Sequence, residues 1–149
     1  MNQPISELNG EKAAFEYNSD GQERDKIIGK SYRFNEPIGG TKPFKGLSLH
    51  KLQRLINKKF ANPQDYHNDA PTIEHLADLG KLAKSEGHKV LFAGFAVDRK
   101  NDYRIDIDSI SIYLDGRNVS QELKNKLSSF KKNADDFVFN DAFMSAWWD

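Results

Sequence analysis

The stretch from Lys89 to Leu114 constrains the fold more than any other part of the chain. It contains two runs with strand character, Val90 to Val97 and Tyr103 to Leu114, on either side of the polar turn 98–102. In the first run, apolar side chains occupy both alternate sets of positions, which is typical of a central strand that is covered on both faces. The sequence therefore predicts a central hairpin over 89–114.

Two positions in this hairpin predict a local irregularity. Gly94 interrupts the first run, and a glycine inside a strand commonly marks a bulge or the close approach of a ring or another backbone. In the second run the apolar phase changes after Asp108, because Ile107 and Ile110 fall on opposite faces of a regular strand. One extra residue near Asp108 and Ser109 would return both isoleucines to one face, which is the pattern of a β-bulge.

Periodicity along the rest of the chain predicts three helices and two further strands. Helices are expected over 47–60 and 72–86, with Ser48 and Thr72 as N-caps, and from a cap at 118–120 to about Asn133. Strands are expected over 26–34, followed by a loop over 35–46, and over 137–149, with Asn140 and Asp141 as the place where the last strand would break. This order predicts an α+β fold with a mostly antiparallel sheet of about four strands and three helices packed on it.

The length of 149 residues suits a single domain. Residues 1–25 are strongly polar, so we expect a mobile N-terminal arm followed by one α+β domain over 26–149. The longest apolar run is far shorter than the roughly 20 residues of a membrane helix, and the first residues lack the pattern of a signal peptide. The chain has no cysteine, which excludes disulfides and thiolate metal sites. These features favour a soluble cytoplasmic protein without a membrane partner.

Charge is unevenly distributed, although the formal net charge is zero. The segment 30–62 holds eight Lys or Arg residues against one acidic residue. Within it, the predicted helix 48–60 would present Lys51, Arg54 and Lys58 on its polar face. A basic amphipathic helix can bind nucleic acid or an acidic protein surface, although many such faces contact only solvent.

The adjacent tryptophans near the C-terminus predict a second contact surface. Neighbouring side chains of a strand point to opposite faces, so one of Trp147 and Trp148 can enter the core while the other needs a cover from elsewhere. Tryptophan is enriched among the residues that dominate protein interfaces. The cover would be another part of this chain, a partner protein or a second copy of the chain.

The carboxylates of the hairpin are the strongest candidates for chemistry. Asp106 and Asp108 share one face of a strand, and paired carboxylates can hold the Mg²⁺ or Mn²⁺ of phosphoryl-transfer enzymes. The solvated face of any antiparallel strand gives the same pattern. The four histidines lack zinc-site spacing, and no nucleophile motif or cofactor-binding motif is found.

These observations favour a small non-enzymatic binding module for a macromolecular partner, such as an inhibitor, immunity or adaptor protein, over an enzyme. Its expected contact residues are Lys51, Arg54, Lys58, Trp147 and Trp148. One alternative is a metal-dependent phosphoesterase or nuclease with Asp106 and Asp108 as ligands. The other is a nucleic-acid binder without catalysis that acts through segment 30–62. No cofactor is expected, and the oligomeric state stays open.

Overall fold

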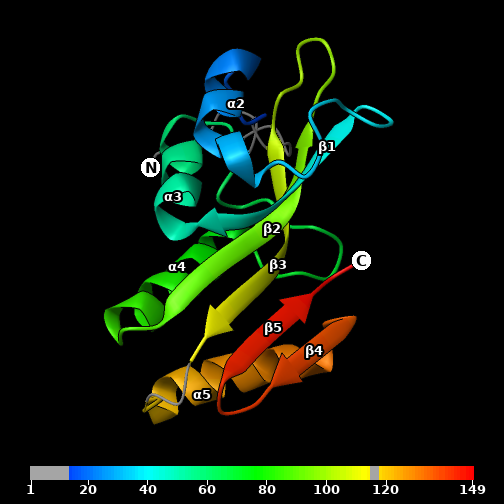
Figure 1. Cartoon of the computed structure of the whole chain (residues 1–149). Coiled ribbons are helices and arrows are strands. Elements are labelled where there is room, and N and C mark those ends of the chain that lie inside the picture. The colour runs from blue at the N-terminus through cyan, green and yellow to red at the C-terminus, as the bar shows by residue number, and fades with distance from the viewer. Residues whose placement is uncertain (1–13, 115–117) are drawn as a thin grey trace, which may run out of the picture.

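A five-stranded antiparallel sheet forms one layer of the computed structural model, and helices form the other (Figure 1). The structure describes residues 14–114 and 118–149. The strand order is β1-β2-β3-β5-β4. The strands are β1 (Thr41–Ser48), β2 (Lys89–Val97), β3 (Ile105–Tyr113), β4 (Asp136–Phe139) and β5 (Phe143–Trp147). The helices are α2 (Gly21–Ile28), α3 (Leu49–Asn57), α4 (Ile73–Ser85) and α5 (Gln121–Ser128), with short 3₁₀ segments at Gly29–Ser31 and Ser129–Lys132. The predicted α+β class and antiparallel sheet are confirmed, with one more strand and one more helix in the described ranges than expected.

The central hairpin forms as predicted, and it contains the predicted bulge. Ala93 pairs with Ser109 whereas Gly94 pairs with Ile107, so Asp108 is the extra residue on β3. The bulge returns the isoleucines before and after it to one face of the sheet. Ile105, Ile107, Ile110 and Ile112 are all fully buried. Gly94 belongs at this point because a side chain there would collide with the carbonyl oxygen of Asp106.

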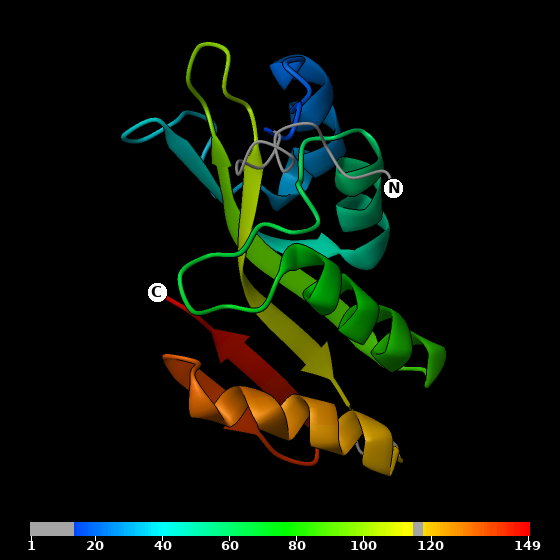
Figure 2. The same ribbon diagram turned by 180° about the vertical axis from the view of Figure 1, so that it is seen from behind.

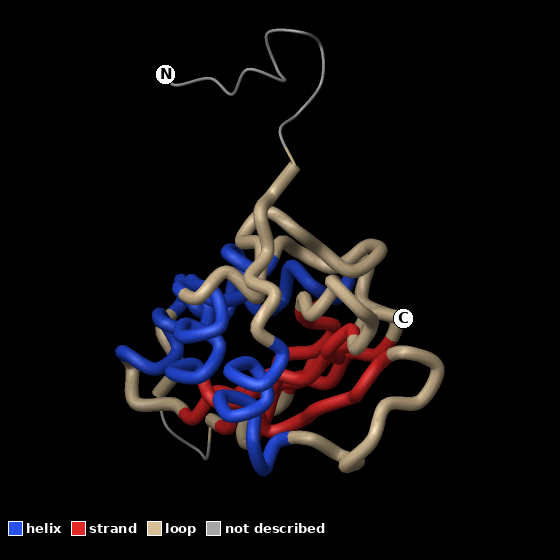
Figure 3. Tube along the Cα trace, turned by 90° about the horizontal axis from the view of Figure 1, so that it is seen from above, coloured by secondary structure: helices blue, strands red, loops and turns tan. Residues whose placement is uncertain are grey.

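The helices all lie on one side of the sheet, as the views from behind and from above show (Figures 2 and 3). α4 packs on β2 and β3, and Gly80 allows this helix to approach Val90 and Phe92. α3 packs on β1 and β2. The predicted N-caps are confirmed, because the side chain of Ser48 accepts from the backbone N–H of Lys51 and that of Thr72 accepts from the backbone N–H of His75. The core therefore lies between these helices and one face of the sheet.

The segment 26–34, predicted as a strand, is helical up to residue 31. α2 begins at Gly21, inside the segment assigned to a mobile arm, while residues 1–13 of that arm lie outside the described part of the chain. Asp20 caps α2 by accepting from the backbone N–H of Glu23, a spacing typical of helix starts. Arg24 is fully buried. The strand prediction was wrong because it read the short apolar pattern of this segment without the cap in front of it.

The segment 35–46, predicted as a loop, contains most of β1. Pro43 fits there because β1 is an edge strand, where a missing N–H leaves no partner unpaired. The C-terminal strand does break near Asn140, as expected: the Asn140 side chain accepts from the backbone N–H groups of Ala142 and Phe143, which turns the chain between β4 and β5. No helix in the described ranges is both long and apolar enough to cross a membrane.

Candidate functional site

The face of the sheet turned away from the helices, here called the open face, is the candidate site. Its side chains alternate along each strand with those of the core. They are Thr41, Pro43, Lys45 and Ser48 of β1, Lys89, Leu91, Ala93 and Phe95 of β2, Asp106, Ser109, Ser111 and Tyr113 of β3, Phe143, Ser145 and Trp147 of β5, and Asp136 and Val138 of β4.

The open face carries a group of apolar side chains among its polar ones, although no helix of the described chain covers it. An antiparallel sheet with one solvated face normally shows polar side chains there. Here Trp147 and Val138 are each 41% exposed, and Phe34 and Ile38 from the loop before β1 are 49% and 64% exposed. β2 contributes Leu91, Ala93 and Phe95. These residues form the second of its two alternate sets of apolar side chains, and this second set is the reason why the sequence predicted a strand covered on both faces. The helices of the described chain cover only one of the two faces, and on the other face the ring of His67 packs against Phe95. Exposed apolar groups gathered on one face mark interaction sites.

One row of side chains crosses all five strands of the open face. Ala93 lies opposite Ser109, Ser109 opposite Trp147, and Trp147 opposite Asp136. On β1, Lys45 and the next residue lie opposite Ala93 at an irregularity between Phe44 and Leu47. The row thus runs from a cation through a small side chain, a serine and a large aromatic side chain to an anion.

Two hollows in the open face meet at Lys45. The first has Ala93 and Ser109 on its floor and is bordered by Phe34, Ile38, Arg33, Asp108 and Trp147. The second lies between Lys30, Tyr32, Leu91, Ser111 and Tyr113. Lys30, Arg33 and Lys45 form no ion pair within the described ranges. The β1 side of the open face therefore carries uncompensated positive charge.

The two tryptophans lie on opposite faces of the sheet, as the alternation requires. Trp148 is fully buried and packs against Phe130, with 5.4 Å between ring centroids. Its backbone N–H donates to the carbonyl of the bulge residue Asp108 at 2.9 Å. The expectation that Trp148 contacts a partner is therefore corrected, because its indole is part of the core. Trp147 keeps the role of a candidate contact residue.

The three basic residues predicted to bind a partner lie on α3 or just after it, beside α2. Lys58 pairs with Glu23 at 3.4 Å, and the ammonium group of Lys51 donates to the carbonyl of Ile28 at 3.3 Å. Arg54 is exposed and lies beside a shallow hollow along α2. Two of the three cations therefore have partners within the chain itself, and none of the three lies on the open face.

The structure places His67 beside the candidate metal ligands. Its Nδ1 lies 2.9 Å from a carboxylate oxygen of Asp106, and its ring packs edge-on against Phe95. Burial raises the pKa of Asp106, against the opposing effect of His67, and burial also raises the pKa of Asp108. Among the described residues, no group of three or more histidine or acidic side chains is arranged to hold a metal ion. The contact between Asp106 and His67 is an interaction that sequence spacing did not predict.

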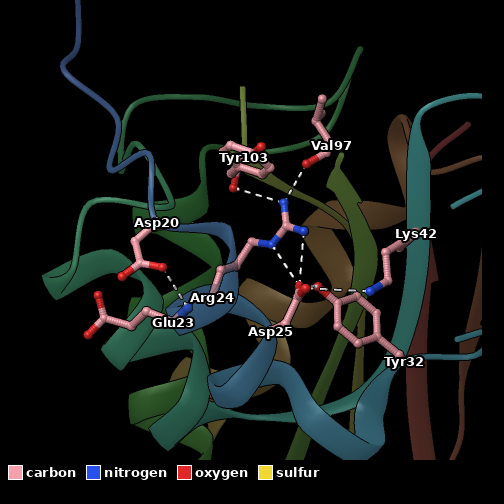
Figure 4. Close-up of polar contacts among 8 residues, drawn as sticks. All are labelled: Asp20, Glu23, Arg24, Asp25, Tyr32, Lys42, Val97 and Tyr103. Atoms are coloured by element: carbon pink, nitrogen blue, oxygen red, sulfur yellow. Dashed lines mark hydrogen bonds and ion pairs between the residues drawn. The ribbon is translucent and has the colours of Figure 1, made fainter. Parts of the chain in front are cut away.

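A buried polar network anchors α2 and the segment that follows it to the sheet (Figure 4). The Arg24 guanidinium donates to the carbonyls of Val97 and Tyr103 and to the carboxylate of Asp25. That carboxylate also accepts from the Tyr32 hydroxyl and lies 3.6 Å from the ammonium nitrogen of Lys42.

The network also determines the charge of its central carboxyl. Burial alone would raise the pKa of Asp25, but the hydrogen bonds from Tyr32 and Arg24 and the attraction of Arg24 and Lys42 outweigh burial and lower it. The pKa of Tyr32 is raised, first by burial and then by its hydrogen bond to Asp25. By fixing Tyr32, the network positions the segment from Arg33 to Ile38 that borders the first hollow.

Several open-face residues were not singled out by the sequence. Lys45, Ala93 and Asp136 enter the site only through strand register, and Phe34 and Ile38 enter through the loop before β1. The sequence feature that pointed to this face was the second alternate set of apolar side chains in β2. No family model, curated protein or solved structure matches the chain.

Proposed function

We propose that the protein is a binding module for a partner protein and that the open face of its sheet is the contact surface. The observation that carries this proposal is the second apolar set of β2, Leu91, Ala93 and Phe95, which no helix of the described chain covers and which lies beside the exposed Trp147. Burying apolar area is the main source of affinity between proteins. An indole near the middle of such a patch is the kind of residue that dominates interface energetics.

The charges on the open face support a protein partner over nucleic acid. Nucleic-acid sites need cations along the whole path of the phosphates. Here Lys30, Arg33 and Lys45 lie on the β1 side, whereas Asp136 lies opposite Trp147 on the β4 side. A phosphate backbone that crossed the row would meet repulsion at that end. A protein surface can instead present both signs of charge around an apolar centre.

The test compares capture by three tagged proteins from a lysate of the source organism: the wild type, Trp147→Glu, and Lys81→Glu as a control. Lys81 lies on the solvent side of α4 and is 56% exposed, so the control changes charge on the opposite layer. Circular dichroism first establishes that each variant is folded. We expect proteins that the wild type and the control retain to be lost by Trp147→Glu.

A fourth protein distinguishes the open face from the basic helix. In it, Lys51, Arg54 and Lys58 are all replaced by alanine, and the open face is left unchanged. Capture that survives Trp147→Glu but is lost in the triple variant would contradict the proposal and favour the surface of α3 as the contact site.

A further inference from the structure

We infer that the partner seated on the open face is a second copy of this chain, packed face to face about a two-fold axis that runs along β3. This inference rests on the proposed function, because it names the occupant of the same surface. Most oligomers of identical chains close by a two-fold axis, and a two-fold interface must be complementary to itself. The open face meets that requirement along its row of cross-strand neighbours.

The strand order supplies the geometry. β3 is the middle strand of the order β1-β2-β3-β5-β4. A two-fold axis that lies between two facing sheets and runs parallel to β3 places β1 of one copy over β4 of the other, and β2 over β5. Rotation about this axis does not shift the second copy along the strand direction, so each cross-strand row lies over the same row of the other copy. Aligned face-to-face packing of two sheets, about 10 Å apart and within roughly 30° of parallel, is a common arrangement.

Sizes match along the row under this operation. Trp147 of each copy lies over Ala93 of the other, so the largest side chain of the row meets the smallest. Ala93 forms the floor of the first hollow, with Phe34 and Ile38 at its border. Ser109 lies at the axis and faces its own copy. In the next row, Leu91 lies over Ser145, which again pairs a large side chain with a small one.

Charges match as well. Lys45 at the β1 end of the row lies over Asp136 at the β4 end of the second copy, and the pair occurs twice. Extended lysine and aspartate side chains together can span the gap between two packed sheets. Asp108 of each copy lies near the axis, and Arg33 and Lys45 at the border of the same hollow offset the repulsion between the two carboxylates. Complementary charge at the rim of an interface fixes orientation more than affinity.

The size of the face sets the expected strength. Four inter-strand spacings of about 4.8 Å give a width of roughly 19 Å. A surface of this width, even with the loop that carries Phe34 and Ile38, falls at the lower end of stable protein interfaces. Because affinity depends on the quality of the contacts more than on the area, the expectation for a small interface is weak association, with a dissociation constant of about 1 to 100 μM.

Sedimentation equilibrium of the purified protein over a range that brackets those concentrations tests the inference. The variants are Trp147→Glu, Lys45→Glu, Asp136→Lys and the double variant Lys45→Glu/Asp136→Lys, with Lys81→Glu as the control. We expect the wild type and the control to form dimers. Trp147→Glu is expected to weaken association at least tenfold, each single charge reversal to weaken it about three- to tenfold, and the double variant to recover most of the loss.

The outcomes separate this inference from the proposed function. A wild type that stays monomeric throughout the range overturns the second copy as occupant, and the proposed function then depends on whether Trp147→Glu loses a different protein in the capture experiment. A dimer that is unaffected by Trp147→Glu also overturns the inference, because association would then use another surface. If the double variant Lys45→Glu/Asp136→Lys dimerises no more tightly than the two single variants, the pairing of Lys45 with Asp136 is contradicted.

Discussion

Gly94 of β2 and Asp106 of β3 approach so closely that no side chain fits between them: a Cβ atom on Gly94 would overlap the carbonyl oxygen of Asp106. The approach occurs where the bulge at Asp108 shifts the register of the two central strands. A methyl group there can be accommodated only by moving the backbone of β3. The bulge, and with it the row of open-face side chains, therefore depends on this glycine.

Gly94→Ala should lower the free energy of unfolding by about 3 kcal/mol or more, at the upper end of the range for overpacking substitutions. Urea denaturation followed by circular dichroism measures the change. Ser111→Ala on the same hairpin serves as the control and is expected to change stability by less than about 0.5 kcal/mol. Equal stability of Gly94→Ala and wild type would show that the strands do not approach as described.

Arg24→Met should destabilise the protein by about 2 to 4 kcal/mol, because it leaves the carbonyls of Val97 and Tyr103 without a donor and removes one partner of Asp25. Chemical denaturation at neutral pH is the measurement. Lys26→Met on the exposed side of α2 is the control, with an expected change within about 0.5 kcal/mol.

The destabilisation by Arg24→Met should also depend on pH. The pKa of Asp25 is lowered in the folded protein, so its ionised form contributes stability at pH values above 3.8, the ordinary pKa of an aspartate. That contribution is lost as the pH falls through the lowered pKa of the folded state. The difference between Arg24→Met and wild type should therefore shrink toward acid pH, and a difference that grows there would contradict the network.

Asp108→Asn should change stability in the opposite direction to Arg24→Met and stabilise the protein at neutral pH. Burial has the largest effect and raises the pKa of Asp108. The attraction of His67 lowers this pKa and repulsion from Asp106 raises it, with a net increase, so the folded state disfavours the carboxylate. A carboxyl with a raised pKa holds its proton more tightly when folded, so stability falls as the pH rises above 3.8, the ordinary pKa of an aspartate.

Thermal denaturation at pH 7 and pH 3 measures the effect of Asp108→Asn. We expect a higher melting temperature than wild type at pH 7 and a smaller difference at pH 3, where both folded and unfolded Asp108 are largely protonated. Asp141→Asn, at an exposed position in the turn between β4 and β5, is the control. A melting temperature that falls at pH 7 would show that the Asp108 carboxylate makes a favourable contact when charged.

The two indoles should differ in fluorescence. Trp148→Phe leaves the half-exposed Trp147, whose emission should be red-shifted and readily quenched by acrylamide in dilute protein. Trp147→Phe leaves the buried Trp148, which should emit at shorter wavelength and resist quenching. Similar quenching of both variants would contradict the assignment of the two side chains to opposite faces.

Sequence patterns predicted the central hairpin, the bulge, Gly94 and the helix caps because these features depend on neighbours close along the chain. The strand predicted over 26–34 and the loop predicted over 35–46 were wrong for the opposite reason. Arg24 is stabilised in the core by carbonyls of residues 97 and 103, and Pro43 is tolerated because its strand lies at an edge, neither of which local spacing reveals.

The candidate site was only partly predictable for the same reason. Trp147 was predicted as a contact residue because of its residue type. Its neighbours Ser109 and Asp136 could not be predicted, because they are set by the register of three strands. The apolar pattern of β2 predicted a strand covered on both faces. It could not indicate that the helices of the described chain would cover only one of them.

Site-specific photo-crosslinking shows whether the open face contacts a partner in the cell. A benzophenone amino acid is introduced at position 147 on the open face or at position 81 on the outer side of α4, and the protein is irradiated in cells of the source organism. We expect a discrete crosslinked protein, either a second copy or another chain, from position 147 and none from position 81. A discrete product from position 81 with none from position 147 would contradict this expectation.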